Sequence, residues 1–115
     1  MPDPSALLPL SGSAFHIMLS LADGEHHGYQ ISKNVEAETD GTIRLGPGTL
    51  YRLLKQMAAD DWIAETSRTD AEDPRRRYYK LTAWGRRIAQ AEAERLARLV
   101  RMARARHLLP SSSRA

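Results

Sequence analysis

The sequence of 115 residues predicts a mainly α fold (α+β) with three helices, a β-hairpin and one long final helix, in that order. Three observations indicate this order. Apolar residues recur at helical spacing in three separate segments before residue 60. Two segments with β-branched and aromatic residues then flank the polar stretch TDAEDP. The last segment, from about residue 83 to residue 107, combines a helical stripe of apolar residues with many arginines.

Two short helices are expected first. One covers about residues 13–21, where a serine can cap its start, and the other covers residues 28–38. The second helix is expected to be buried through Ile31 and Val35, which lie four residues apart. The segment between the two helices, ADGEHHG, is expected to be a loop. The apolar side of the first helix is expected to hold Phe15, Met18, Leu19 and Ala22.

The stretch LGPGTLYRLLKQM contains the third helix. Pro47 suits its first position, because the missing backbone N–H of proline would have no partner there. Apolar residues then follow at the spacing of one buried face over residues 50–57. A glycine-rich lead into a helix can also bind a nucleotide, but the lysine spacing of a Walker loop and a preceding strand are both missing. The opposite face of the helix collects Gly48, Thr49, Tyr51, Arg52, Lys55, Gln56 and Ala59.

Next, WIAETSR and RRRYYKLT are expected to pair as a β-hairpin with a charged tip. Tyr79 shares one face of the returning strand with Leu81, so Tyr79 is expected to pack rather than to stack on a base. Three arginines at the base of the hairpin can meet a phosphate backbone, or they can balance the acidic residues of the tip. Both hold if the acidic residues keep the arginines until DNA displaces them. The residues concerned are Arg75, Arg76 and Arg77, with Asp70, Glu72 and Asp73 in the tip.

The last helix is expected from Ala83 to about His107, with Thr82 as its cap. At roughly 25 residues it is about 37 Å long, which is too long to lie wholly on so small a body. Its arginines indicate either a sequence-independent DNA clamp or the solvated sides of a dimer seam, and its apolar stripe favours the seam. Glu92 interrupts this stripe and could pair with an arginine of a partner chain. The predicted dimer interface consists of Ile88, Glu92, Leu96, Leu99, Val100 and Ala103.

Composition bounds the possible functions. Cysteine is absent, which excludes a disulfide framework and cysteine-based metal or nucleophile chemistry. The adjacent His26 and His27 lack the spacing of a helical metal pair, and no catalytic grouping is apparent. We therefore expect no metal, no cofactor and no enzymatic activity. No signal peptide or membrane-spanning segment is apparent either, which favours a cytoplasmic protein.

The net charge of +3 is unevenly distributed. Residues 1–85 hold nine Lys and Arg against twelve Asp and Glu, a net charge of −3. Residues 86–115 hold eight Arg against two Glu, a net charge of +6. The overall basic character therefore says little about where an anionic partner would bind, and local clusters must decide this.

Three helices followed by a two-stranded hairpin form the winged helix-turn-helix arrangement, whose third helix enters the DNA major groove. We expect an N-terminal arm (1–11), a DNA-binding domain (12–82), a dimerisation helix (83–108) and a disordered tail (109–115). Tyr29 lies off the buried stripe of its helix, and it either covers the wing or meets a phosphate. The predicted DNA-binding residues are Tyr29, Gly48, Thr49, Tyr51, Arg52, Lys55, Gln56, Arg75, Arg76 and Arg77.

Three motifs resemble those of the PadR family of bacterial transcriptional regulators: HGYQI, then GPGTLYRLLKQM with DDWI, then RRRYYKLTAWGRR. The resemblance implies a homodimeric winged-helix repressor that binds double-stranded DNA, of the short subfamily with a single helix after the wing. It also implies a small apolar or aromatic effector near the dimer interface. Phe15 and Trp84 are candidate effector contacts, and ordinary core packing is the alternative for both. Arg52 stands where many members have proline, and Asp61 stands where a glycine commonly precedes the first wing strand.

The first functional hypothesis is therefore a dimeric DNA-binding repressor that a small effector releases from its operator. The alternative is a protein-interaction adaptor that keeps the winged-helix shape without specific DNA binding. The net charge of −3 over residues 1–85 keeps this alternative open.

Overall fold

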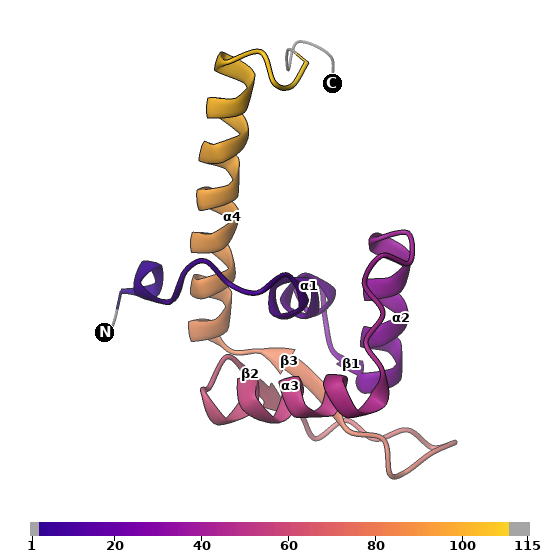
Figure 1. Ribbon diagram of the computed structural model, residues 1–115. Helices are drawn as coiled ribbons and strands as arrows, with labels where there is room; N and C mark the ends of the chain where they lie inside the picture. Colours follow the sequence, from indigo (N-terminus) through magenta and orange to yellow (C-terminus); the bar gives the residue numbers. More distant parts are fainter. Residues whose placement is uncertain (1–2, 111–115) are drawn as a thin grey trace.

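The computed structural model describes residues 3–110 and has the predicted order of elements (Figure 1). Of the predicted disordered tail, residues 111–115 lie outside the described residues. The elements in chain order are η1 (Pro4–Leu7), α1 (Gly12–Ser20), β1 (His26–His27), α2 (Gly28–Glu38), α3 (Pro47–Ala59), β2 (Ile63–Glu65), β3 (Tyr78–Leu81) and α4 (Ala83–Ala105).

The strands form a small antiparallel sheet with β3 between β1 and β2. His26 pairs with Tyr79 at one side of β3, and Ile63 pairs with Leu81 at the other. The prediction that ADGEHHG is a loop is wrong for its two histidines. Two residues are too short to show an alternating pattern, and their pairing with the distant β3 makes them a strand. The three helices and this sheet make a mainly α winged helix-turn-helix, as predicted.

The core lies where α1, α2, α3 and the start of α4 meet the sheet. On α2 and α3 the predicted faces are buried, except that Leu53 is only half-buried. Fully buried side chains from these elements are Ile17, Met18, Leu21, Ile31, Val35, Leu54, Ile63 and Ile88.

The predicted apolar side of α1 is partly wrong. Leu19 is exposed and Phe15 is half-buried, whereas Ala14 and Ile17 are buried together with the correctly predicted Met18. The helix contacts α2 on one side and α4 on another, so its buried face is wider than the single stripe that was assumed.

The wing is the hairpin formed by β2 and β3 with the loop between them. A tight backbone contact joins its start to α4. Thr82 caps α4 by accepting the Gly85 N–H, and its own N–H and hydroxyl both donate to the carbonyl oxygen of Trp62. A Cβ on Gly85 would lie 1.9 Å from that oxygen, which no side chain can occupy. Glycine at this position therefore lets the first turn of α4 lie directly against the start of β2.

The turn between α3 and β2 is made without glycine. The Trp62 N–H donates to the Met57 carbonyl at 2.9 Å, and the Asp61 N–H donates to the Ala58 carbonyl at 3.1 Å. These are the two hydrogen bonds of a Schellman motif, in which the residue after the cap has a left-handed backbone. Asp61 has φ of 64°, so it keeps the glycine-type turn at the cost of some backbone strain.

Two of the predicted dimer residues belong to the core of the single chain. Ile88 is fully buried, and Glu92 is only 2% exposed. The Glu92 carboxylate accepts the N–H of Leu10 at 3.0 Å and pairs with Arg95 of its own helix. Hydrogen bonding to Arg95 is the main cause that lowers the pKa of Glu92. The prediction that Ile88 and Glu92 form a dimer interface is therefore wrong, because the apolar stripe is covered by the chain itself up to this point.

Beyond Glu92, α4 projects away from the body (Figure 1). Its side chains from Leu96 to Met102 are exposed, and Ala103 is half-buried. This projecting part keeps the remaining predicted interface residues, Leu96, Leu99, Val100 and Ala103, on one side of the helix at spacings of three and four residues.

Candidate nucleic-acid interface

The polar face of α3 is exposed as predicted. Gly48, Thr49, Tyr51, Arg52, Lys55 and Gln56 are all solvent-exposed. Among the described residues, Arg52 and Lys55 form no ion pair and no side-chain hydrogen bond, so their charges are free for a ligand. Gln56 differs, because its side-chain amide donates to the Asp60 carboxylate at 3.0 Å, one turn further along the helix.

The arginines of the wing precede β3 instead of forming part of it. The predicted strand RRRYYKLT begins only at Tyr78, and residues 66–77 form the loop of the hairpin. Arg75 is 95% exposed, Arg77 is 69% exposed and Arg76 is 38% exposed. Packing was predicted for Tyr79, and its side chain is indeed buried on the sheet.

Arg75, Arg76 and Arg77 each have an acidic neighbour. Nη1 of Arg76 is 3.0 Å from Oδ2 of Asp70, and Nε of Arg75 is 3.7 Å from Oδ1 of Asp73. Arg77 lies 3.7 Å from Glu65 on β2. The alternative that the arginines balance acidic residues is therefore correct for the free protein, although Glu72 is not one of the partners.

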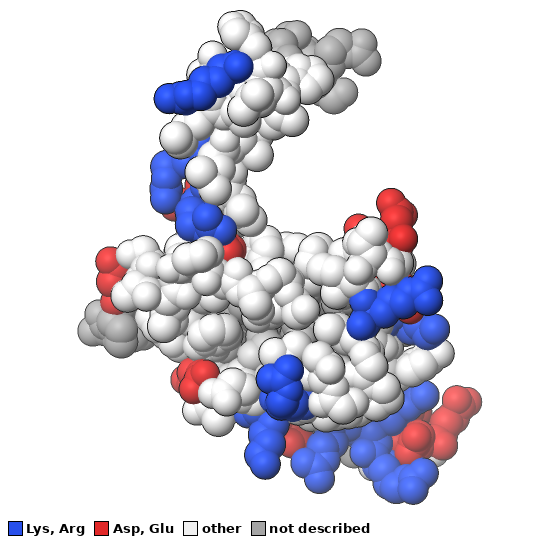
Figure 2. All heavy atoms as spheres, viewed as in Figure 1, with Lys and Arg blue, Asp and Glu red and all other residues white. Residues whose placement is uncertain are grey.

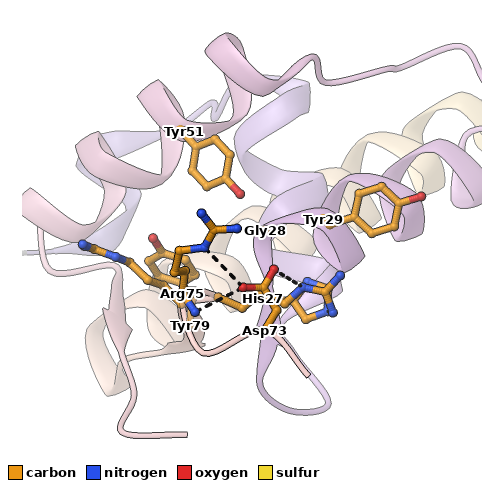
Figure 3. A pocket seen from close by; sticks show the side chains of 9 residues that line it. His27, Gly28, Tyr29, Tyr51, Asp73, Arg75 and Tyr79 are labelled. Atoms are coloured by element: carbon orange, nitrogen blue, oxygen red, sulfur yellow. Dashed lines mark hydrogen bonds and ion pairs between the residues drawn. The ribbon is translucent and has the colours of Figure 1, made fainter. Parts of the chain in front are cut away.

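A cleft of about 710 Å³ lies between the wing loop, the start of α2 and α3 (Figure 3). It brings together five of the predicted DNA-binding residues from three elements, and it leaves Gly48, Thr49, Arg52, Lys55 and Gln56 outside, elsewhere on α3. The residues that line it are His27, Gly28, Tyr29, Tyr51, Asp73, Arg75, Arg76, Arg77 and Tyr79.

Tyr51 joins α3 to the start of α2 within this cleft. A Cβ on Gly28 would lie 2.8 Å from Oη of Tyr51, so the glycine makes room for the tyrosine. Tyr29, the residue after Gly28, is exposed and has the ammonium of Lys33 over its ring at 5.3 Å. Both phenol groups therefore lie at the edge of the cleft where an approaching anion would meet them.

His27 is a residue of this site that the sequence analysis missed. Its Nδ1 caps α2 by accepting the Gln30 N–H at 3.2 Å, and its Nε2 lies 3.3 Å from Nη1 of Arg76. Burial, and then the charge of Arg76, lower the pKa of His27. The imidazole is therefore neutral at pH 7, as accepting the Gln30 hydrogen requires. The only sequence signal was its position directly before a glycine that opens a helix.

Charged side chains gather on the face of the molecule that α3 and the hairpin form. Figure 2 shows Lys and Arg side chains under α3 and along the hairpin, with Asp and Glu among those of the hairpin. A second group of arginines lies on the projecting part of α4, away from this face.

The remaining predictions concern other parts of the chain. Phe15 and Trp84 are both half-buried, and Trp84 packs against the core with the Arg87 guanidinium over its ring at 5.2 Å. Within residues 3–110, no group of three or more metal-ligating side chains lies close enough to hold an ion. No helix of the described chain is long and apolar enough to cross a bilayer.

The fold and this face define a winged-helix protein with an exposed, cationic third helix. Residues 17–91 match the family described as "Transcriptional regulator PadR-like family", and the chain belongs to that family. Its members are transcriptional regulators and not enzymes, in agreement with the expected absence of catalysis.

A curated relative is similar over most of the chain. It is an uncharacterized 37.1 kDa protein in transposon TN4556 of Streptomyces fradiae, 39% identical over 83 residues. The match covers 72% of this chain but only 22% of the relative, so the chain spans less than a quarter of that protein's length.

Solved structures share the fold. A PadR family transcription regulator from Clostridium difficile has a TM-score of 0.69 at 23% identity, covering 83% of this chain and 97% of that one. PadR from Bacillus subtilis, solved in complex with operator DNA, has a TM-score of 0.62 at 22% identity, covering 76% of this chain and 48% of that one.

Proposed function

We propose that the chain is a sequence-specific DNA-binding regulator that acts as a homodimeric repressor in the cytoplasm. The observation that carries this proposal is the exposed face of α3, where Arg52 and Lys55 have no partner among the described residues. The operator complex of Bacillus subtilis PadR supports it by showing that a protein of the same fold binds DNA.

In the proposed complex, α3 enters the major groove. Thr49, Arg52 and Lys55 supply donors and acceptors toward base edges, and Arg52 can bond a guanine through two donors at once. Gln56 can take part only if it gives up its hydrogen bond to Asp60. The small side of Gly48 would let the helix backbone approach the DNA closely.

The cleft beside α3 would bind the sugar–phosphate backbone. Arginine side chains and tyrosine hydroxyls are common donors to phosphate oxygens and carry no sequence information of their own. Arg75 is the best placed of the wing arginines, because it is almost fully exposed and its nearest acidic group is 3.7 Å away. Tyr29 and Tyr51 would donate from the opposite edge of the cleft.

We further propose that the projecting part of α4 forms the dimer seam. Leu96, Leu99 and Val100 are exposed apolar side chains on the part of α4 that the body does not cover. Met102 is more exposed than any of these three and was not predicted. Packing this stripe against a second copy would bury it, and two copies of α3 would then meet half-sites about 34 Å apart on one face of the DNA.

The dimer is tested with Leu99→Glu in sedimentation equilibrium. Leu99 is exposed in the single chain, so the charge should leave the monomer folded while it prevents the seam from closing. Ala105→Glu is the matched control, because Ala105 is exposed on the opposite side of the same helix. We expect a monomer for the first variant and a dimer for the second. A dimeric Leu99→Glu protein would place the interface elsewhere.

We also propose that a small apolar or aromatic effector releases the repressor, with contacts to Phe15 and Trp84. The two side chains are half-buried on α1 and α4, which pack against each other. Double-stranded DNA, a second copy and this effector are thus the proposed partners.

A gel shift with the DNA upstream of the chain's own gene tests the central proposal, because such repressors commonly control neighbouring genes. We expect a shift that survives competition by unrelated DNA and is lost in Arg52→Ala. No shift even at low salt would favour the protein-interaction adaptor, which the net charge of −3 over residues 1–85 keeps as the second candidate.

A further inference from the structure

The cleft contains an acidic group that does not suit a phosphate site. Asp73 lines it together with three arginines and two exposed tyrosines. Figure 3 shows its carboxylate joined to the neighbouring arginine side chains. Any DNA phosphate that enters the cleft must therefore separate Asp73 from its arginines or stay beside a negative charge.

Arg76 is held by two carboxylates at once. Its Nη1 lies 3.0 Å from Oδ2 of Asp70, and its Nε lies 3.7 Å from Oδ2 of Asp73. Arg75 shares Asp73 through the other oxygen, at 3.7 Å. Asp70 and Asp73 thus form ion pairs with Arg75 and Arg76 on the side of the cleft nearest the hairpin tip.

The loop itself fixes both carboxylates. Oδ1 of Asp70 accepts the Glu72 N–H at 2.9 Å, and Oδ1 of Asp73 accepts the Arg75 N–H at 3.2 Å. Each side chain therefore closes a local turn with one oxygen and keeps the other oxygen directed at an arginine. The acidic groups would stay in place when the arginines leave them.

We propose that Asp70 and Asp73 are an internal competitor of DNA, which sets the level of sequence-independent binding. The inference rests on the proposed DNA binding and adds a role for acidic residues within the same site. A carboxylate and a phosphate bind a guanidinium through the same kind of charge-assisted hydrogen bonds, so one replaces the other at the wing. The free cations of α3, Arg52 and Lys55, need no such exchange.

The exchange has a measurable consequence. Sequence-independent binding comes almost wholly from neutralised phosphates and weakens with salt in proportion to their number. Carboxylates left beside the DNA cancel part of the arginine charge, so Arg75, Arg76 and Arg77 together neutralise fewer phosphates than three unpaired arginines would. Removing the two acidic charges should therefore both tighten binding to arbitrary DNA and increase its salt dependence.

The test measures binding of the intact chain to a labelled duplex of arbitrary sequence by fluorescence anisotropy over a series of KCl concentrations. The variants are Asp70→Asn, Asp73→Asn and the double variant, because asparagine keeps the Oδ1 acceptor that closes each turn. We expect the double variant to bind about three- to tenfold more tightly than wild type at about 0.1 M salt. The slope of log affinity against log salt should steepen by roughly 1.

Glu72→Gln is the matched control. Glu72 is exposed in the same tip and carries the same charge, but it forms no ion pair among the described residues. We expect its affinity to change by less than about twofold. Thermal unfolding of all variants verifies that the wing and the body remain folded.

The outcomes separate the two proposals. Equal effects of Glu72→Gln and the single variants Asp70→Asn and Asp73→Asn would show a general charge effect and overturn the competitor role. Wild-type affinity and salt slope in the double variant would overturn it as well, while DNA binding itself would stand. Failure of every protein, wild type included, to bind any duplex at low salt would overturn the proposed function and this inference with it.

Discussion

The helix α3 and the wing present cations on the same face of the molecule but hold them in different ways. On α3, Arg52 and Lys55 extend from a helix that starts at a proline and ends in a Schellman motif, and they have no partner among the described residues. In the wing, Arg75, Arg76 and Arg77 lie in the hairpin loop over residues 66–77, and each of these three has an acidic neighbour.

This difference indicates that α3 and the wing make different kinds of contact with DNA. A guanidinium on a rigid helix, without an internal partner, can adopt the geometry that a base edge requires at the cost of its own side-chain entropy only. A paired guanidinium on a loop must exchange one anion for another, which suits a phosphate contact whose position varies. We infer that α3 discriminates between sequences and that the wing adds affinity without discrimination.

The largest effect is expected where the wing is joined to the body. Gly85→Ala would place a methyl group 1.9 Å from the Trp62 carbonyl oxygen, so α4 and β2 would have to separate. We expect the free energy of unfolding to fall by about 3 kcal/mol or more, measured by urea unfolding. Gly24→Ala is the control, because nothing lies within 4 Å of that position and little change is expected. Equal stability of the two variants would show that the contact between Gly85 and the Trp62 carbonyl can widen without cost.

The second effect separates folding from binding on α3. Gly48 has no neighbour within 4 Å, so Gly48→Ala should stabilise the helix by about 0.5–1 kcal/mol. The added methyl group would stand between the backbone and DNA, and operator affinity should fall by about tenfold, equivalent to about 1.4 kcal/mol. Unfolding and gel-shift titrations measure the two quantities. Unchanged operator affinity would mean that the backbone of α3 does not approach DNA at this point.

A smaller effect is expected at the connection between α3 and the wing. Asp61 has φ of 64°, which glycine adopts without strain. Asp61→Gly should therefore raise the free energy of unfolding by about 0.5–1 kcal/mol, with operator affinity unchanged. Thermal unfolding and a binding titration provide the measurements. A loss of stability would show that the aspartate has a favourable role that outweighs its backbone strain.

The smallest effect concerns pH and the contact between the wing and α2. The pKa of His27 is lowered in the folded chain, so its contribution to stability is present above the unfolded pKa near 6.5 and is lost as pH falls through the folded value. Asparagine is a good helix cap that does not titrate, so stability should fall less between about pH 6.5 and pH 5 in His27→Asn than in wild type. Parallel stability curves for the two proteins would exclude a contribution from His27.

Local features of this chain could be predicted from its sequence, and long-range features could not. The start of α3 at Pro47 and its buried face follow from neighbouring residues, and the structure has both. The strand at His26 depends on pairing with Tyr79, more than fifty residues away, and no local pattern indicates it. Asp61 was recognised as a departure from the family, but only the backbone shows that the turn is kept.

The point at which the apolar stripe of α4 changes from buried to exposed could likewise not be predicted from the sequence. Ile88 and Leu96 follow the same helical pattern, yet the body covers the first and leaves the second exposed. The wing shows the opposite case, because the sequence suggested that acidic residues hold the arginines and the structure has these pairs. The pairing of a particular arginine with a particular acid, and the cap at His27, required the arrangement of the loop.

The most direct test of the division between α3 and the wing compares Arg52→Ala with Arg75→Ala on two duplexes. One is the operator that wild type selects from random DNA, and the other is a scrambled sequence of the same length. We predict that Arg52→Ala lowers the ratio of operator to scrambled affinity by roughly tenfold or more. Arg75→Ala should weaken both by the same factor and reduce the salt slope by less than the roughly 0.9 of an unpaired phosphate contact, because Asp73 cancels part of its charge. An unchanged ratio in Arg52→Ala, or a ratio lost in Arg75→Ala, would contradict the account.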